Sequence, residues 1–173
     1  GDGNFNPATN HSVGDNSAPH NVLVTDIDQD GDLDIVTANT GSASLGILLG
    51  NNDGTFSDVE TFSVSDDPFG VAVGDFNNDG KPDLATSTWG SKSEVSVLLG
   101  TGDNTFDDAT HFAAGGTVYR IAVADFDMDG NQDLAISNFF QASISVLPGN
   151  GEPAFNFVGL KQAPEEEAPA GEE

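Results

Sequence analysis

Three short acidic segments of the sequence have the residue types and the spacing of metal-binding loops. Each has Asp or Asn at its first, third and fifth positions, glycine at its sixth and aspartate at its ninth. They are loop 1 (residues 26–34, DIDQDGDLD), loop 2 (residues 75–83, DFNNDGKPD) and loop 3 (residues 125–133, DFDMDGNQD). Crowded carboxylates repel one another, and a hard cation with oxygen ligands relieves this repulsion. The pattern predicts three cation sites, for which Ca²⁺ is the usual ion.

An EF-hand begins with the same pattern, but it needs a glutamate at position twelve and a helix on each side. Position twelve is Thr37, Thr86 and Ile136 in the three copies, within sequence typical of strands. We therefore reject an EF-hand. Magnesium is a weaker candidate, because it tolerates crowded cages made only of protein ligands poorly.

The loops belong to a repeat of about 50 residues with four strand-like elements in each copy. A short apolar run precedes each loop, a second run follows it, a third alternates apolar and small residues, and a fourth comes after a Gly/Asn/Asp turn. The first runs are 22–24, 71–73 and 121–123, the second 33–37, 83–86 and 133–136, the third 45–49, 95–99 and 144–147, and the fourth begin at Phe56, Phe106 and Phe155. Four short antiparallel strands per repeat match one propeller blade. We expect an all-β protein of three four-stranded antiparallel β-propeller-type blades.

The two ends of the chain differ from the repeats. Residues 1–5 (GDGNF) are similar to residues 52–56 (NDGTF), which predicts an extra outer strand within residues 1–13. The repeats then span about 14–62, 63–112 and 113–160. Residues 162–173 contain Pro, Ala and Glu without periodicity, so we expect an acidic tail without a core. Because the chain starts inside a repeat-like turn, we expect its natural N-terminus to lie upstream.

The composition excludes several classes of partner. With 29 acidic and 4 basic residues and a formal charge of -25, the chain should bind neither nucleic acid nor an anionic membrane surface by electrostatics. No apolar stretch approaches the ~20 residues of a membrane span. There is no cysteine, which excludes disulfides and thiolate zinc sites. Self-repulsion of this size predicts that folding depends on bound metal.

Residues 69–84 (FGVAVGDFNNDGKPDL) resemble the FG-GAP repeat, an integrin-alpha-like or VCBS-type β-propeller repeat. The resemblance extends over about residues 1–158. It implies an extracellular protein that binds Ca²⁺ between the first two strands of each blade and serves adhesion, recognition or cell-surface architecture. Closed propellers contain ~4–8 blades, whereas three are present here. We therefore expect a partial propeller, or one completed by other copies.

The resemblance, together with the loop geometry, also implies the ligands. Side chains at positions one, three, five and nine and the backbone carbonyl at position seven would bind the ion. The ligands are Asp26, Asp28, Asp30, Asp34 and the carbonyl of Asp32 in loop 1; Asp75, Asn77, Asp79, Asp83 and the carbonyl of Lys81 in loop 2; and Asp125, Asp127, Asp129, Asp133 and the carbonyl of Asn131 in loop 3. Loop 2 has one carboxylate fewer and an added lysine, so we expect it to be the weakest site.

No sequence motif indicates catalysis. The three histidines, His11, His20 and His111, share no metal-ligand spacing, and no nucleophile motif or phosphate-binding loop is present. We expect a non-catalytic, extracellular, calcium-binding structural or adhesion module that self-associates, joins a cell-surface component, or forms part of a larger propeller or filament. An alternative is a lectin-like propeller, in which Trp89 or Tyr119 lines a sugar-binding hollow, although these two residues hold different repeat positions. A further alternative is the accessory domain of an enzyme.

Overall fold

The computed structural model of the protein describes residues 3–90 and 92–152. These residues form thirteen strands in four antiparallel sheets. Within those residues the only helical element is a short 3-10 turn, η1 (Thr40–Ser42). The prediction of an all-β protein is confirmed. No helix in the described part of the chain is long and apolar enough to cross a membrane.

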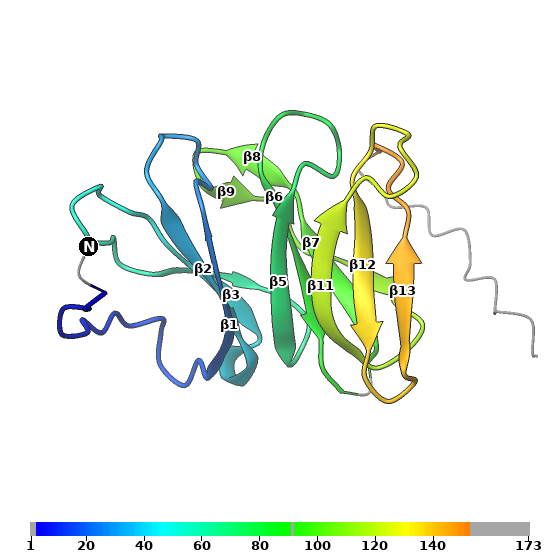
Figure 1. Cartoon of the computed structure of the whole chain (residues 1–173), viewed down its shortest axis with the longest axis horizontal. Coiled ribbons are helices and arrows are strands. Elements are labelled where there is room, and N and C mark those ends of the chain that lie inside the picture. Colours follow the sequence, from blue (N-terminus) through cyan, green and yellow to red (C-terminus); the bar gives the residue numbers. More distant parts are fainter. Residues whose placement is uncertain (1–2, 91, 153–173) are drawn as a thin grey trace, which may run out of the picture.

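Three larger sheets follow one another along the chain (Figure 1). The first has the strand order β1 (Pro19–Thr25), β2 (Asp34–Asn39), β3 (Ser44–Leu48) and β4 (Glu60–Ser63). The second has the order β5 (Pro68–Gly74), β6 (Asp83–Thr88), β7 (Glu94–Leu98) and β10 (Thr110–Ala113). The third contains β11 (Val118–Ala124), β12 (Asp133–Asn138) and β13 (Ser143–Leu147), and a two-stranded hairpin joins β8 (Gly100–Gly102) to β9 (Thr105–Phe106).

The central strands β3 and β6 consist mostly of apolar and small residues, which suits strands that are covered on both faces. Every residue of β3 and β6 is buried. One hydrophobic core lies between the first and second sheets and another between the second and third. The first core includes Val36, Leu45, Ile47, Val71 and Leu84, and the second includes Ala85, Val95, Val97, Leu134 and Ile136. The first strands β1, β5 and β11 contact one another in turn, so each sheet packs against the next.

The fourth strands begin later than the sequence predicts. Phe56 forms only an isolated bridge with Gly50, and Phe106 pairs with Gly100 in the β8–β9 hairpin. The chain therefore first folds back on itself after the third strand. Only then does it enter β4 or β10, which pair with β3 and β7.

The predicted extra strand within residues 1–13 is wrong, since residues 3–18 form no strand and Phe5 is fully exposed. The fourth strand of a repeat pairs with the third strand, and in the first sheet β4 already occupies the outer edge of β3. The place of a fourth strand in the first sheet is therefore already filled. The predicted fourth strand at Phe155 and the acidic tail at 162–173 lie outside the described residues. Within the described residues the third sheet has three strands.

Candidate metal centre

The three acidic loops join the first and second strands of the three large sheets, and all lie at the upper end of the molecule in Figure 1. Each loop turns through two residues with positive φ, at positions four and six. These are Gln29 and Gly31, Asn78 and Gly80, and Met128 and Gly130. Glycine adopts the positive φ at position six without strain. The left-handed conformation at position four costs a non-glycine residue about 1 kcal/mol and has no clear signal in the sequence.

The aspartate at position nine is buried and ties two distant backbone segments together. In loop 1, Asp34 accepts hydrogen bonds from the N–H groups of Ile27 at 2.7 Å and Gly50 at 2.8 Å. The corresponding bonds run from Phe76 and Gly100 to Asp83 and from Phe126 and Gly149 to Asp133. This carboxylate therefore links the start of its loop to the glycine two residues beyond the end of the third strand.

This link explains the glycine after each third strand. A Cβ added at Gly50 would lie 2.3 Å from the carbonyl oxygen of Leu33, and the same clash occurs at Gly100 and Gly149. No side chain fits in this position, because the backbones of the two turns approach so closely there. Sequence reasoning assigned position nine only a metal-binding role and missed this structural one.

The remaining acidic side chains fold inward by accepting hydrogen bonds from their own loop. Asp26 accepts from Gly31 at 3.1 Å, Asp28 from Asp30 at 3.2 Å, and Asp30 from Asp32 at 2.8 Å. The same bonds recur in the other two loops, with Asp75, Asn77, Asp79, Asp125, Asp127 and Asp129 as acceptors. The three predicted ligand sets thus share one backbone arrangement.

Two of the loops gather three carboxylates into a triad. One oxygen each of Asp26, Asp28 and Asp34 lie within 4.8 Å of one another, and Asp125, Asp127 and Asp133 do the same. The predicted ligands at position five, Asp30 and Asp129, lie outside these triads and bond to the backbone of position seven.

The donor set of loop 1 fits a hard cation. Oδ1 of Asp26 is buried and has no hydrogen-bond partner among the described residues. Burial, together with the carboxylates of Asp30, Asp34 and Asp26, raises the pKa of Asp28 against the opposing effect of the Asp30 N–H. An orphaned oxygen and crowded negative charges are what a bound Ca²⁺ would satisfy.

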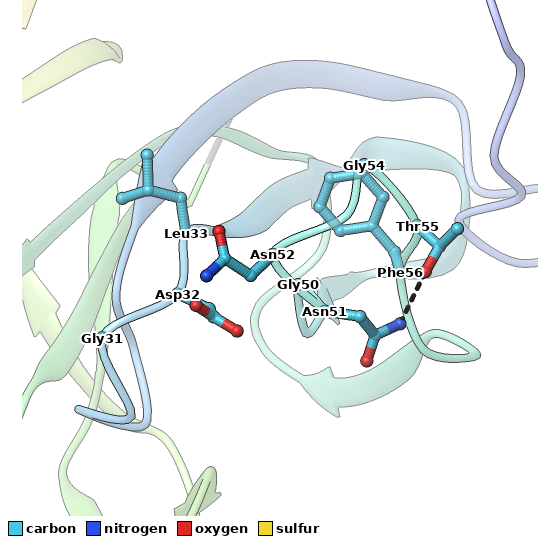
Figure 2. A pocket seen from close by; sticks show the side chains of 9 residues that line it. All are labelled: Gly31, Asp32, Leu33, Gly50, Asn51, Asn52, Gly54, Thr55 and Phe56. Atoms are coloured by element: carbon cyan, nitrogen blue, oxygen red, sulfur yellow. Dashed lines mark hydrogen bonds between the residues drawn. The ribbon is translucent and has the colours of Figure 1, made fainter.

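The side chain of Asp32 lies outside the triad. It lines a hollow between loop 1 and the turn after β3, together with Leu33, Asn52 and Phe56, as Figure 2 shows. A hydrogen bond of 2.9 Å from Asn51 to Thr55 closes that turn. The expected binding of a metal ion by the backbone carbonyl of Asp32 stays a prediction.

Loop 2 differs from the other two, because Nζ of Lys81 forms an ion pair of 3.1 Å with Oδ2 of Asp79. Hydrogen bonds from the backbone and the side chain of Lys81 lower the pKa of Asp79, although burial opposes them. With Asn77 at position three, loop 2 holds no triad of acidic groups in the described structure. The local charge available to a cation is smaller here than in loops 1 and 3.

Hydrogen bonds also connect each loop to the next. Gln29 of loop 1 donates to the carbonyl of Gly80 in loop 2 at 3.0 Å, and Asn78 of loop 2 donates to the side chain of Asn131 in loop 3 at 2.7 Å. The residue equivalent to Gln29 and Asn78 in loop 3 is Met128, which is almost fully exposed. The loops therefore form one connected row.

The histidines lie apart from these loops. His11 and His20 contact the rings of Phe56 and Phe69, and His111 shares a hydrogen bond with Ser96. Among the described residues, no histidine belongs to a group that could hold a metal ion.

A comparison with curated protein sequences finds no match. A comparison with family models matches the FG-GAP-like repeat over residues 1–37, 26–86 and 87–136. Together the matched segments run without a gap from residue 1 to residue 136 and contain all three loops. The chain therefore belongs to the family of FG-GAP-like repeat proteins.

Proposed function

We propose that this protein is a non-catalytic, calcium-stabilised structural or adhesion module of the extracellular space, in which each repeat is one β-propeller-type blade. The observation that carries the proposal is the pair of carboxylate triads built by equivalent residues of a repeat. Extracellular Ca²⁺ is millimolar, a concentration that suits sites of modest affinity.

In this proposal the residues at positions one, three, five and nine and the carbonyl at position seven hold one Ca²⁺ in each loop. The ion supplies positive charge that offsets the repulsion among the carboxylates. The aspartate at position nine also bonds to the glycine after the third strand. Ordering the loop would therefore order the first three strands of the repeat, and the binding free energy would add to stability.

The two end sheets support a role in assembly, because each exposes apolar residues that the middle of the molecule buries. The trailing face (Phe126, Ile144 and Val146) is exposed on the third sheet. Phe126 is 51% and Ile144 73% exposed, whereas the equivalent Phe76 and Val95 of the second sheet are 1% and 0% exposed. The third sheet thus presents the surface that the second sheet packs against its neighbour.

The first sheet exposes the leading face (Val22 and Val24), which corresponds to the surface that the second sheet packs against the first. Val22 is 62% exposed, whereas the equivalent Val71 is 5% exposed because it packs on the first sheet. In the proposed assembly a leading face covers a trailing face, with further repeats supplied by a second copy or by a longer chain. Such head-to-tail contacts are heterologous, and they produce either a closed ring or a filament.

Isothermal titration calorimetry with CaCl₂ tests the metal-binding part of this proposal. We expect three sites per chain, with loop 2 the weakest. Asp26→Asn should remove one site, whereas Asp58→Asn, at an exposed aspartate outside the loops, should leave all three. Absence of heat at millimolar CaCl₂, or loop 2 as the tightest site, would contradict it.

A further inference from the structure

Five aromatic side chains gather where β5 and β11 begin and where β6 and β12 end. These ends of the four strands lie opposite to the acidic loops, at the bottom of Figure 1. Phe69 and Tyr119 are the second residues of β5 and β11, Trp89 follows β6, and Phe139 and Phe140 follow β12. We call these five residues the aromatic surface. Phe69 and Tyr119 hold equivalent positions in their repeats, as do Trp89 and Phe139, so two neighbouring repeats build the surface together.

The rings form one continuous cluster. Tyr119 lies at its centre, with its ring centroid 4.6 Å from Phe69, 5.3 Å from Trp89 and 5.5 Å from Phe139. Phe140 lies 5.2 Å from Phe139 and 5.9 Å from Trp89. Trp89 and Tyr119 are therefore neighbours in space, although they differ in repeat position.

The surface is too small to be the core of a protein–protein interface. Phe139 and Phe140 are 59% and 69% exposed, and Phe69, Trp89 and Tyr119 are partly buried. Since one aromatic side chain offers ~150–250 Å², the two most exposed rings present about 250 Å² of apolar area. A standard protein interface needs ~800 Å² from each partner. The area fits a small, flat ligand instead.

A cation lies over this surface. Arg120 is the single arginine of the chain, and its guanidinium carbon is 5.5 Å from the ring centres of both Phe69 and Tyr119. It is exposed, and in the part of the chain that the structure describes it forms no ion pair; the lysines Lys81 and Lys92 do. In a chain of net charge -25, an unpaired guanidinium on an aromatic patch is positioned to take one carboxylate in bidentate geometry.

Polar groups surround the rings. His20 is exposed and stacks on Phe69 at 4.6 Å. The exposed Asp67 accepts a hydrogen bond from the backbone N–H of Trp89 through its backbone carbonyl. The side chain of Gln141 follows Phe140 directly and accepts from Thr117 at 3.1 Å. The site therefore combines flat apolar rings with hydrogen-bonding groups at their margin.

A pyranose sugar matches both properties, because it has an apolar C–H face and a rim of hydroxyl groups. We propose that the aromatic surface binds a pyranose residue of a glycan, and that Arg120 selects a sugar bearing a carboxylate, such as a uronic or sialic acid. Polyanions are disfavoured by the charge of the whole chain, so the ligand is a glycan with isolated acidic residues. This inference does not depend on calcium binding by the loops.

A glycan array containing neutral, uronic-acid and sialic-acid glycans, probed in millimolar CaCl₂, tests the inference. The wild-type protein should be retained most strongly by carboxylate-bearing glycans. Phe140→Ala should weaken that signal at least tenfold, and Arg120→Gln should abolish the preference over neutral glycans. Phe5→Ala removes a fully exposed phenylalanine that is not part of the aromatic surface and should change nothing. Circular dichroism checks that all variants fold alike.

Intrinsic fluorescence gives an independent readout, since Trp89 is the only tryptophan in the chain. Titration with the best-retained glycan should change its emission and give a dissociation constant that Phe140→Ala raises at least tenfold. The inference is overturned if no glycan retains the wild-type protein. It is also overturned if Phe140→Ala binds as the wild type does, or if saturation leaves the Trp89 emission unchanged. Glycan binding without calcium binding would leave this inference standing and overturn only the proposed function.

Discussion

At the scale of single residues, the aspartate at position nine has two roles. It is a predicted metal ligand, and it also accepts two backbone hydrogen bonds while buried. The sequence could predict the first role, because ligand spacing is local. It could not predict the second, because the partner Gly100 is 17 residues away from Asp83 and only the folded third strand brings it near.

Replacing Asp83 by asparagine tests the structural role. The amide keeps the shape but accepts through a single oxygen, so one buried N–H loses its partner. Each such loss costs ~1–3 kcal/mol. We expect Asp83→Asn to lower the free energy of unfolding by about 2 kcal/mol in urea titrations, whereas the exposed Asp58→Asn should change it by less than about 0.5 kcal/mol. Equal stabilities of the two variants would contradict the role.

The pH should control calcium binding at loop 2. Burial raises the pKa of Asp83 from 3.8 to about 6, although the N–H groups of Gly100 and Phe76 oppose the shift. The raised pKa means that ionisation destabilises the metal-free fold, so that fold gains stability as the pH falls from 7 toward 4. Calcium needs the ionised form.

We therefore expect loop 2 to bind Ca²⁺ about tenfold more weakly at pH 5 than at pH 7. The amide resonance of Gly80, which lies in this loop, reports the binding during NMR titrations at the two pH values. An affinity that is the same at both pH values would show that Asp83 does not limit binding in this range.

At the scale of elements, the loops form a row connected by hydrogen bonds from position four. Asn78→Ala removes one of these bonds and should loosen the contact between loops 2 and 3. One exposed hydrogen bond contributes ~0.5–1 kcal/mol, so we expect calcium binding at both loops to weaken by about two- to fivefold. Met128→Ala is the matched control, since Met128 is the equivalent residue and is almost fully exposed. Equal effects of both variants in calorimetry would argue against the connection.

The order and type of most strands could be predicted, because apolar runs and turn residues are local signals. The starts of β4 and β10 could not, because the Gly50–Phe56 bridge and the β8–β9 hairpin use the predicted strand residues first. The N-terminal strand was predicted from a sequence similarity that carries no information about a free sheet edge. The aromatic surface was missed for a related reason, since Trp89 and Tyr119 meet only through the packing of two sheets.

At the scale of the whole molecule, the leading and trailing faces predict association between ends. The double substitution Ile144→Asp and Val146→Asp places charge on residues that are exposed in the single chain. We expect light scattering in CaCl₂ to show concentration-dependent association of the wild type and a monomer for the variant, with unchanged folding. Phe5→Ser should associate as the wild type does. A wild type that stays monomeric at every concentration would contradict this assembly.

The central claim is that divalent ions hold these repeats in their folded form. Thermal unfolding followed by circular dichroism, in millimolar CaCl₂ and in excess EDTA, tests it most directly. Three sites that are each saturated about 100-fold above Kd contribute ~2.7 kcal/mol apiece. The midpoint should therefore rise by at least about 10 °C in calcium. Identical unfolding curves in the two solutions would contradict the account.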